Sequence, residues 1–131
     1  MAIETNHNLT DRKPLPVMQK MIAIYKQWHS FLPNFPKTAR YTLGLKIDIL
    51  FTDITELIFI ASYQPKESKA GYIEKAITKL DLLKFFLQIA WEIKALDNKR
   101  YINLSEQLHE VGRMLGGWAR QTKNSLASSL S

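Results

Sequence analysis

The side chains with the most distinctive chemistry in this sequence of 131 residues are lysines and arginines, gathered in two stretches that contain no acid. Seven lie between Arg12 and Ile47, and three more follow Val111. These stretches contribute ten positive charges, and an excess of four acids in the rest of the chain lowers the net charge to +6. Blocks of one charge attract phosphates or an acidic protein, although a basic surface can also serve only to keep a protein in solution. We predict nucleic-acid contacts from nine side chains: Arg12, Lys13, Lys20, Lys26, Lys37, Arg40, Arg113, Arg120 and Lys123.

Groups that could hold a metal or carry out catalysis form no recognisable pattern. His7, His29 and His109 are far apart, and neither a Glu-x-x-His nor a His-Glu-x-x-His spacing is present. The absence of cysteine excludes thiolate metal sites, thiol nucleophiles and disulfides. The glycines between 112 and 117 match neither a dinucleotide-binding motif nor a phosphate-binding loop. We therefore expect no enzyme, no cofactor and no metal, and keep catalysis only as a third, residual hypothesis.

Three glycines, Gly112, Gly116 and Gly117, fall within the last predicted helix, where each costs about 1 kcal/mol relative to alanine. Gly112 and Gly116 are four residues apart and share one face. That face allows a neighbouring helix to approach closely, an interpretation that we favour over a ligand-binding cleft. Gly44 in the second predicted helix favours the same interpretation.

Apolar residues recur at steps of three and four along most of the chain, which predicts amphipathic helices. Prolines and glycines separate four of them, at about residues 16–32, 37–62, 67–96 and 98–122. Short connections between such helices predict an all-α fold, an antiparallel up-down-up-down four-helix bundle over residues 14–123. We expect the polar residues 1–13 to form a flexible arm and residues 124–131 a frayed tail.

The third helix is more apolar than one buried face requires. One stripe runs from Ile73 to Trp91 and a second from Leu82 to Leu96. Because the bundle core covers only one stripe, the other predicts a contact with another subunit.

The second helix is apolar over more than half of its circumference, and its β-branched run could be taken for a strand. Its apolar residues do not alternate, however, and Asp48, Asp53 and Glu56 are spaced to lie on the exposed side of a helix.

The last helix has the most regular pattern. Its apolar positions follow steps of 3, 4, 3, 4 and 3: Tyr101, Leu104, Leu108, Val111, Leu115 and Trp118. This is the seam of a coiled-coil-like packing. Asp97, just before the helix, is a suitable N-cap.

The start of the sequence does not read as a signal peptide, and charged residues interrupt every long apolar stretch. These features predict a soluble, cytoplasmic protein.

An antiparallel bundle brings its last helix to an end where its first helix begins. This end is expected to gather Arg12, Lys13, Lys20, Lys66, Lys69, Arg120 and Lys123. The opposite end is expected to gather Lys37, Arg40, Lys99 and Arg100. Both sets could contact phosphates, but neither includes an element that reads bases. Aromatic residues are too sparse to indicate a stacking platform for single strands.

Five stretches resemble the Avd family, the accessory variability determinants of diversity-generating retroelements. They are LPVMQKM (15–21), FPKTARYTLG (35–44), SYQPKE (62–67), KLDLLKFFLQIAWEIKAL (79–96) and VGRMLGGW (111–118). Bundle proteins encoded in intervening sequences of ribosomal RNA share the FPK-x-x-RY and GRML elements. They carry a small-residue NIAEG-like motif where this chain has ILFTDITELIFIASY, so the retroelement branch is favoured.

The resemblance implies a four-helix protomer that assembles into a homopentameric barrel. It also implies a basic protein that binds RNA and DNA without strong sequence preference. Such proteins associate with the retroelement reverse transcriptase and support mutagenic cDNA synthesis. The alternative is a stand-alone structural or protein-interaction bundle, without a reverse-transcriptase partner, whose basic face meets an acidic protein.

Overall fold

A computed structural model describes residues 15–130, so the predicted arm with Arg12 and Lys13 lies outside the described residues. Within this part of the chain, four long helices make up most of the structure: α2 (Pro16–Phe31), α4 (Leu45–Ser62), α5 (Lys66–Glu92) and α6 (Asn98–Leu130). Three short helical segments lie between α2 and α4: η1 (Leu32–Asn34), α3 (Lys37–Ala39) and η2 (Arg40–Gly44). No strand occurs between residues 15 and 130, in agreement with the predicted all-α fold.

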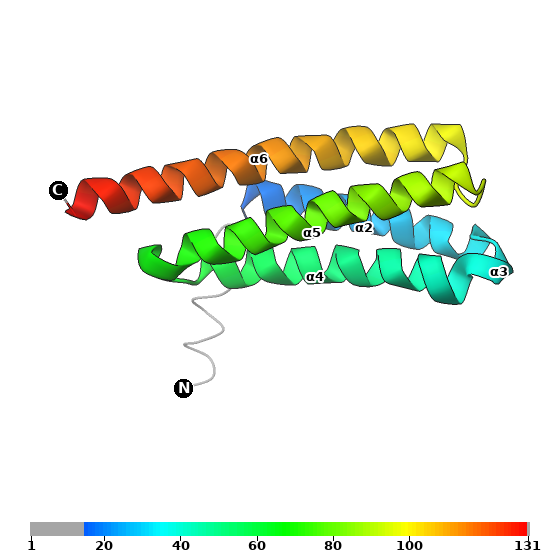
Figure 1. Cartoon of the computed structure of the whole chain (residues 1–131), viewed down its shortest axis with the longest axis horizontal. Helices are drawn as coiled ribbons and strands as arrows, with labels where there is room; N and C mark the ends of the chain where they lie inside the picture. Colours follow the sequence, from blue (N-terminus) through cyan, green and yellow to red (C-terminus); the bar gives the residue numbers. More distant parts are fainter. Residues whose placement is uncertain (1–14, 131) are drawn as a thin grey trace.

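The four long helices lie side by side and alternate in direction along the chain (Figure 1). α2 packs against α4 and α6, and α5 packs against the same two helices. This is the arrangement of an antiparallel four-helix bundle. The contacts that join α4 to α5 and α5 to α6 are much more extensive than those of α2. α2 is therefore the least extensively packed of the four.

The apolar repeat of α6 faces the core of the bundle. Leu104, Leu108, Val111 and Leu115 are at most 4% exposed, as their spacing predicts. A cluster of aromatic rings fills the core near α3, where the ring of Trp28 lies 5.7 Å from that of Phe35 and 5.9 Å from that of Phe51, measured between centroids. Ring pairs at this separation stabilise the packing beyond the area that they bury.

The two apolar stripes predicted for α5 have different surroundings. The first supplies the core with Ile73, Ala76, Leu80, Leu83, Leu87 and Ala90. Trp91, predicted on the same stripe, is 38% exposed, because its ring stacks on Tyr101 of α6 at 5.0 Å instead of entering the core. On the second stripe, Leu82 and Ile93 are 39% and 55% exposed. Nothing in the described part of the protomer fully covers them.

The second predicted helix, residues 37–62, is not a uniform α-helix in the structure. α3 and α4 form its two parts, and η2, a π-helical turn, joins them. Tertiary contacts hold this turn, since the guanidinium of Arg40 donates hydrogen bonds to the carbonyls of Pro33 (2.6 Å) and Phe35 (3.0 Å). A Cβ on Gly44 would lie 3.4 Å from the ring of Phe35, which agrees with the close packing predicted there. The predicted helix at 37–62 is helical throughout, but the π-helical turn within it was not predicted, because the contacts that hold it come from residues before the helix.

α5 ends at Glu92, earlier than the predicted end at residue 96. Lys94 adopts a left-handed conformation, with a φ of 65°. The N–H of Ala95 then donates to the carbonyl of Ala90 at 2.8 Å, a hydrogen bond typical of a Schellman motif that ends a helix. Leu96 is still buried, at 1% exposure, because the chain turns back over the core.

α6 continues to Leu130, past the end predicted at residue 122. The last residues contain no glycine or proline that would end a helix. Ser129 also donates from its hydroxyl to the carbonyl of Ser125, at 3.1 Å. The end of α6 therefore projects, as a helix, beyond the start of α2 (Figure 1).

Candidate nucleic-acid interface

α2 and α6 are neighbours that run in opposite directions (Figure 1). Amide side chains fix their register, because Gln27 and Gln107 exchange two hydrogen bonds, at 3.0 and 2.9 Å. Gln107 also donates to the side-chain oxygen of Asn103 at 3.0 Å. Because the helices are antiparallel, residues before Gln27 on α2 lie opposite residues after Gln107 on α6. Lys20 therefore lies opposite the part of α6 that contains Arg113. We call the outward-facing residues of these two helices the α2–α6 face.

Four cationic side chains of the α2–α6 face form no ion pair with any residue between 15 and 130: Lys20, Lys26, Lys99 and Arg120. Lys20 is half-buried and the other three are exposed. Since no carboxylate of residues 15–130 neutralises them directly, these groups can meet phosphates without first breaking an ion pair within this part of the chain.

Arg113 and Lys123, also predicted as phosphate contacts, have partners in the protomer. The guanidinium of Arg113 forms an ion pair with Glu110, one turn earlier, in which its Nε lies 3.0 Å from Oε2. The Nζ of Lys123 lies 3.4 Å from Oε1 of Glu74 on α5, so this lysine is at the edge of the face toward α5. Exposed pairs of this kind contribute little to stability, so a phosphate can replace the carboxylate.

Lys37 and Arg40 lie near α3, at the end of the bundle opposite the start of α2 (Figure 1). Lys37 is exposed and unpaired within the described residues. Arg40 is half-buried, and its hydrogen bonds to two carbonyls hold η2. The geometry therefore favours a structural role for Arg40, whereas Lys37 extends the basic surface around the end of the bundle.

Asp97 caps the start of α6, as the sequence predicts. The backbone N–H of Arg100 donates to Asp97 Oδ1 at 2.7 Å, and Arg100 Nη1 lies 2.6 Å from Oδ2. The backbone hydrogen bond, followed by the contacts with the Arg100 side chain, lowers the pKa of Asp97. The guanidinium carbon of Arg100 lies 4.6 Å from the centre of the Phe31 ring on α2. Arg100 is thus held between α6 and α2.

The glycines of α6 differ in their surroundings. A Cβ on Gly112 would lie 3.4 Å from Leu80 Cδ2 and 3.4 Å from Lys84 Nζ, so α5 does approach closely there. A Cβ on Gly116 or Gly117 would meet nothing within 4 Å. The predicted close packing within the protomer therefore holds for Gly112 and is wrong for Gly116, whose Cβ position has open space around it.

No cluster of side chains suited to metal binding occurs in the described part of the chain. No group of three or more histidines and carboxylates between residues 15 and 130 could hold a metal ion. Ser105, His109 and Asp81 line an open depression of about 410 Å³ between α5 and α6, but no hydrogen bond joins these three side chains. No helix of the described residues is both long and apolar enough to cross a lipid bilayer.

The amide layer between α2 and α6 was not predicted, because Gln27 and Gln107 are 80 residues apart. Lys99 was predicted only at an end of the bundle and not among the nine contacts, because it lies in a stretch that also contains acids. A helical wheel could have placed it beside Asn103, four residues later, on the same side of α6.

The fold and this surface define a class of protein, an all-helical bundle with a basic face shared by two adjacent helices. Residues 15–122 match the model of the family described as bAvd-like. Because the match covers most of the chain, the protein belongs to the bAvd-like family, as the resemblance of its motifs predicted. No curated protein matches the sequence.

Proposed function

We propose that this chain is a non-catalytic accessory protein of a diversity-generating retroelement. It binds RNA and DNA and associates with the reverse transcriptase to support mutagenic cDNA synthesis. Membership of the bAvd-like family supports the accessory role. The observation that carries nucleic-acid binding is the set of cations on the α2–α6 face that have no ion-pair partner among residues 15–130.

Binding by these groups is largely independent of base sequence. Lysine and arginine side chains neutralise phosphates and release condensed counterions, which supplies affinity without reading base edges. The bundle presents them on two adjacent helices, so their spacing is set by the fold before the nucleic acid arrives. The expected result is a low sequence preference and a strong dependence on salt.

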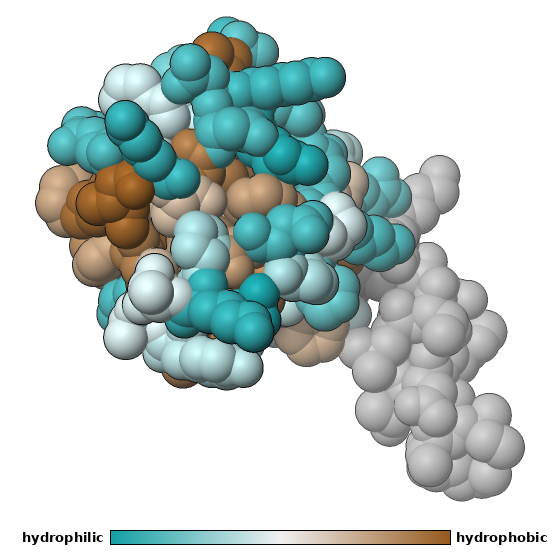
Figure 2. Space-filling model, turned by 90° about the vertical axis from the view of Figure 1, so that its right-hand side faces the viewer, coloured by the Kyte–Doolittle hydropathy of each residue, from teal (hydrophilic) through white to brown (hydrophobic). Residues whose placement is uncertain are grey.

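The apolar surface of α4 and α5 supports self-association, and we propose a homopentamer. Large exposed hydrophobic side chains on these helices include Leu45, Ile49, Phe59, Leu82 and Phe85. Figure 2, viewed from the end that carries α3, shows hydrophobic side chains gathered on one side of the molecule. A contiguous exposed apolar surface of this kind is typical of a contact with another protein chain.

A salt titration of RNA binding tests the proposed function. A fluorescent 20-base-pair RNA duplex is titrated with the protein between about 50 and 200 mM salt, and log K should fall linearly with log salt concentration. The double variant Lys26→Glu, Arg120→Glu should bind at least about tenfold more weakly at low salt and give a shallower slope. Because both side chains are exposed, the helical content should be unchanged.

A matched control reverses the same number of charges elsewhere. Lys46→Glu, Lys75→Glu changes exposed lysines of α4 and α5. If this control weakens binding as much as the first variant, the α2–α6 face is not the binding surface. If the wild-type protein binds the duplex no better than a neutral bundle does, nucleic-acid binding itself is wrong. Copurification of a polymerase despite nuclease treatment, without RNA binding, would favour the alternative of a protein-interaction module.

A further inference from the structure

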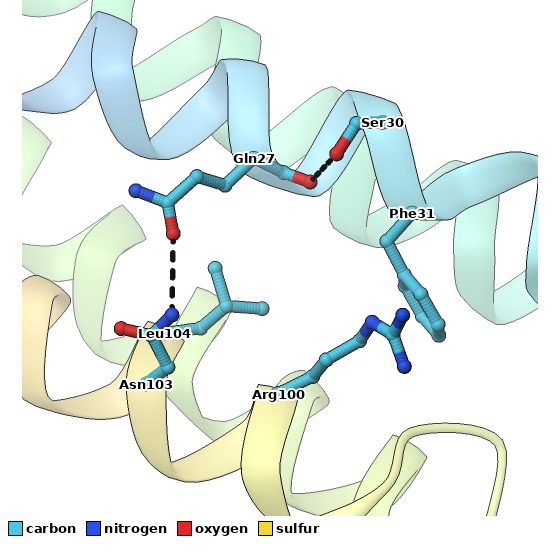
Figure 3. A pocket seen from close by; sticks show the side chains of 6 residues that line it. All are labelled: Gln27, Ser30, Phe31, Arg100, Asn103 and Leu104. Atoms are coloured by element: carbon cyan, nitrogen blue, oxygen red, sulfur yellow. Dashed lines mark hydrogen bonds between the residues drawn. The ribbon is translucent and has the colours of Figure 1, made fainter.

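A pocket of about 200 Å³ lies between α2 and α6 at the level of the amide layer (Figure 3). Gln27, Ser30 and Phe31 line it from α2, and Arg100, Asn103 and Leu104 from α6. Figure 3 shows Leu104 pointing into the middle, with Gln27 and Asn103 on one side and Arg100 beside Phe31 on the other. The volume is below the range typical of pockets for drug-sized ligands. It is suited to a single small, flat group.

The planar guanidinium of Arg100 forms one wall of this pocket. It lies 4.6 Å from the centre of the Phe31 ring, and Asp97 fixes it from behind through an ion pair of 2.6 Å. The side chain is still 50% exposed, so part of it remains accessible to a ligand. Guanidinium planes, like aromatic rings, are surfaces on which unstacked bases stack. A flat ring can stack on this plane without displacing the Asp97 carboxylate from the guanidinium.

Amides form the opposite wall. The reciprocal hydrogen bonds between Gln27 and Gln107 hold the Gln27 side chain in place. The side-chain nitrogen of Asn103 lies 3.5 Å from Gln27 Oε1, at the limit of a hydrogen bond, so this donor is poorly satisfied. A carboxamide presents a donor and an acceptor side by side, which is the pattern that pairs with the edge of a base.

Two unpaired lysines flank the pocket, one on each helix. Lys26 precedes Ser30 by four residues on α2, and Lys99 precedes Asn103 by four on α6, so each lies one turn from a lining residue and toward solvent. Neither forms an ion pair within residues 15–130. The cations therefore lie outside the pocket, where the phosphates on either side of an inserted base would lie.

We propose that this pocket binds one unpaired base of a single-stranded nucleic acid. The base stacks on Arg100, its edge meets the amides of Gln27 and Asn103, and Lys26 and Lys99 contact the flanking phosphates. The inference rests on the proposed nucleic-acid binding and adds a preference for single strands over duplexes. The preference arises because a paired base must first be removed from its stack, at an energetic cost.

Variants that change the pocket without changing the net charge distinguish the contribution of the pocket to binding from that of the cations on the α2–α6 face. The probes are a 12-nucleotide adenine RNA, the same DNA, and an RNA duplex, with one internal adenine of each single strand replaced by 2-aminopurine. Asn103→Leu should weaken single-strand binding by about fivefold or more and abolish the fluorescence change of 2-aminopurine, with duplex affinity unchanged. Ser30→Phe, which fills the pocket from α2 and keeps both amides, should have the same effect.

Gln19→Leu is the matched control, since Gln19 is an exposed amide of α2 outside the pocket. It should leave all three affinities unchanged, and circular dichroism should show equal helical content for every variant. If both pocket variants bind single strands as well as the wild-type protein does, the pocket does not bind a base. The proposed function would still hold if duplex binding remained salt-dependent. If the pocket variants lose affinity for the single-stranded RNA but not for the DNA, the pocket recognises the ribose 2′-hydroxyl. That result would contradict binding of the base. Failure of the wild-type protein to bind any of the three probes would instead contradict the proposed function.

Discussion

The indole nitrogen of Trp28 donates a hydrogen bond to Asp48 Oδ1 at 3.1 Å, which joins the core of α2 to α4. Trp28 is fully buried, so its N–H needs an acceptor inside the protein. The spacing of acids along the second helix placed Asp48 on the exposed side, and that prediction was wrong, because the residue is half-buried. Burial, and then the nearby Asp48 carboxylate, raise the pKa of Tyr25.

Replacement of Asp48 by leucine should destabilise the bundle by about 1–3 kcal/mol, because the indole N–H of Trp28 would remain buried without an acceptor. Asp48→Asn keeps an oxygen at this position and should cost less. Urea unfolding followed by circular dichroism measures both. A leucine variant as stable as the wild-type protein would show that water satisfies Trp28.

Gly116→Ala should stabilise the protein by about 1 kcal/mol, because a helical glycine is replaced where a Cβ meets nothing within 4 Å. Gly112→Ala should gain less, since its Cβ would lie 3.4 Å from Leu80 and Lys84. The melting temperatures of the two variants, measured side by side, check the order. A loss of stability for Gly116→Ala would mean that another molecule approaches α6 closely at that point.

Asp97→Ala should destabilise the protein at neutral pH and have no effect in strong acid. Hydrogen bonding lowers the pKa of Asp97 in the folded protein below its usual 3.8, so folding favours the charged carboxylate. The resulting stabilisation is complete above pH 3.8 and disappears as the pH falls through the lowered folded value. Thermal unfolding of both proteins between pH 7 and pH 2 measures this difference. A difference that is constant over that range would contradict the assigned role of the charge.

Phe85→Glu should dissociate the proposed pentamer. Phe85 is 54% exposed on α5, so a charge there costs the protomer little but prevents apolar contact with another subunit. Light scattering should give about five times the 15.2 kDa of one chain for the wild-type protein and a smaller assembly for the variant. Ile102→Glu, at a similarly exposed position of α6, is the control and should retain the wild-type mass. A wild-type protein that is strictly monomeric would contradict the proposal.

The sequence predicts those parts of the fold that depend on local periodicity. The repeat through Leu104, Leu108 and Val111 identifies the buried face of α6, because residues three and four apart share one side of a helix. Local periodicity does not predict the π-helical turn η2, since this turn depends on the hydrogen bonds of Arg40 to carbonyls before α3. Local patterns carry no information about such tertiary contacts.

The candidate site is only partly predictable for the same reason. Charge blocks indicate Lys20, Lys26 and Arg120, because runs without acid are visible in one dimension. The pairing of Gln27 with Gln107 depends on how two distant helices align, which composition and spacing do not determine. The stacking surface was missed because it is a guanidinium held against a ring, not an exposed aromatic residue.

The limited packing of α2 has a thermodynamic consequence. α4, α5 and α6 are joined by extensive contacts, whereas α2 is attached to them by fewer. Detachment of α2 is therefore the opening reaction expected to need the least free energy, and hydrogen exchange should be fastest there among the long helices. A strand that binds across α2 and α6 only while both helices are packed together raises the free energy of opening, by an amount that grows with the ratio of its concentration to its Kd. Bound nucleic acid would then stabilise the packing of α2 against α6, and this stabilisation would disappear when the nucleic acid dissociates.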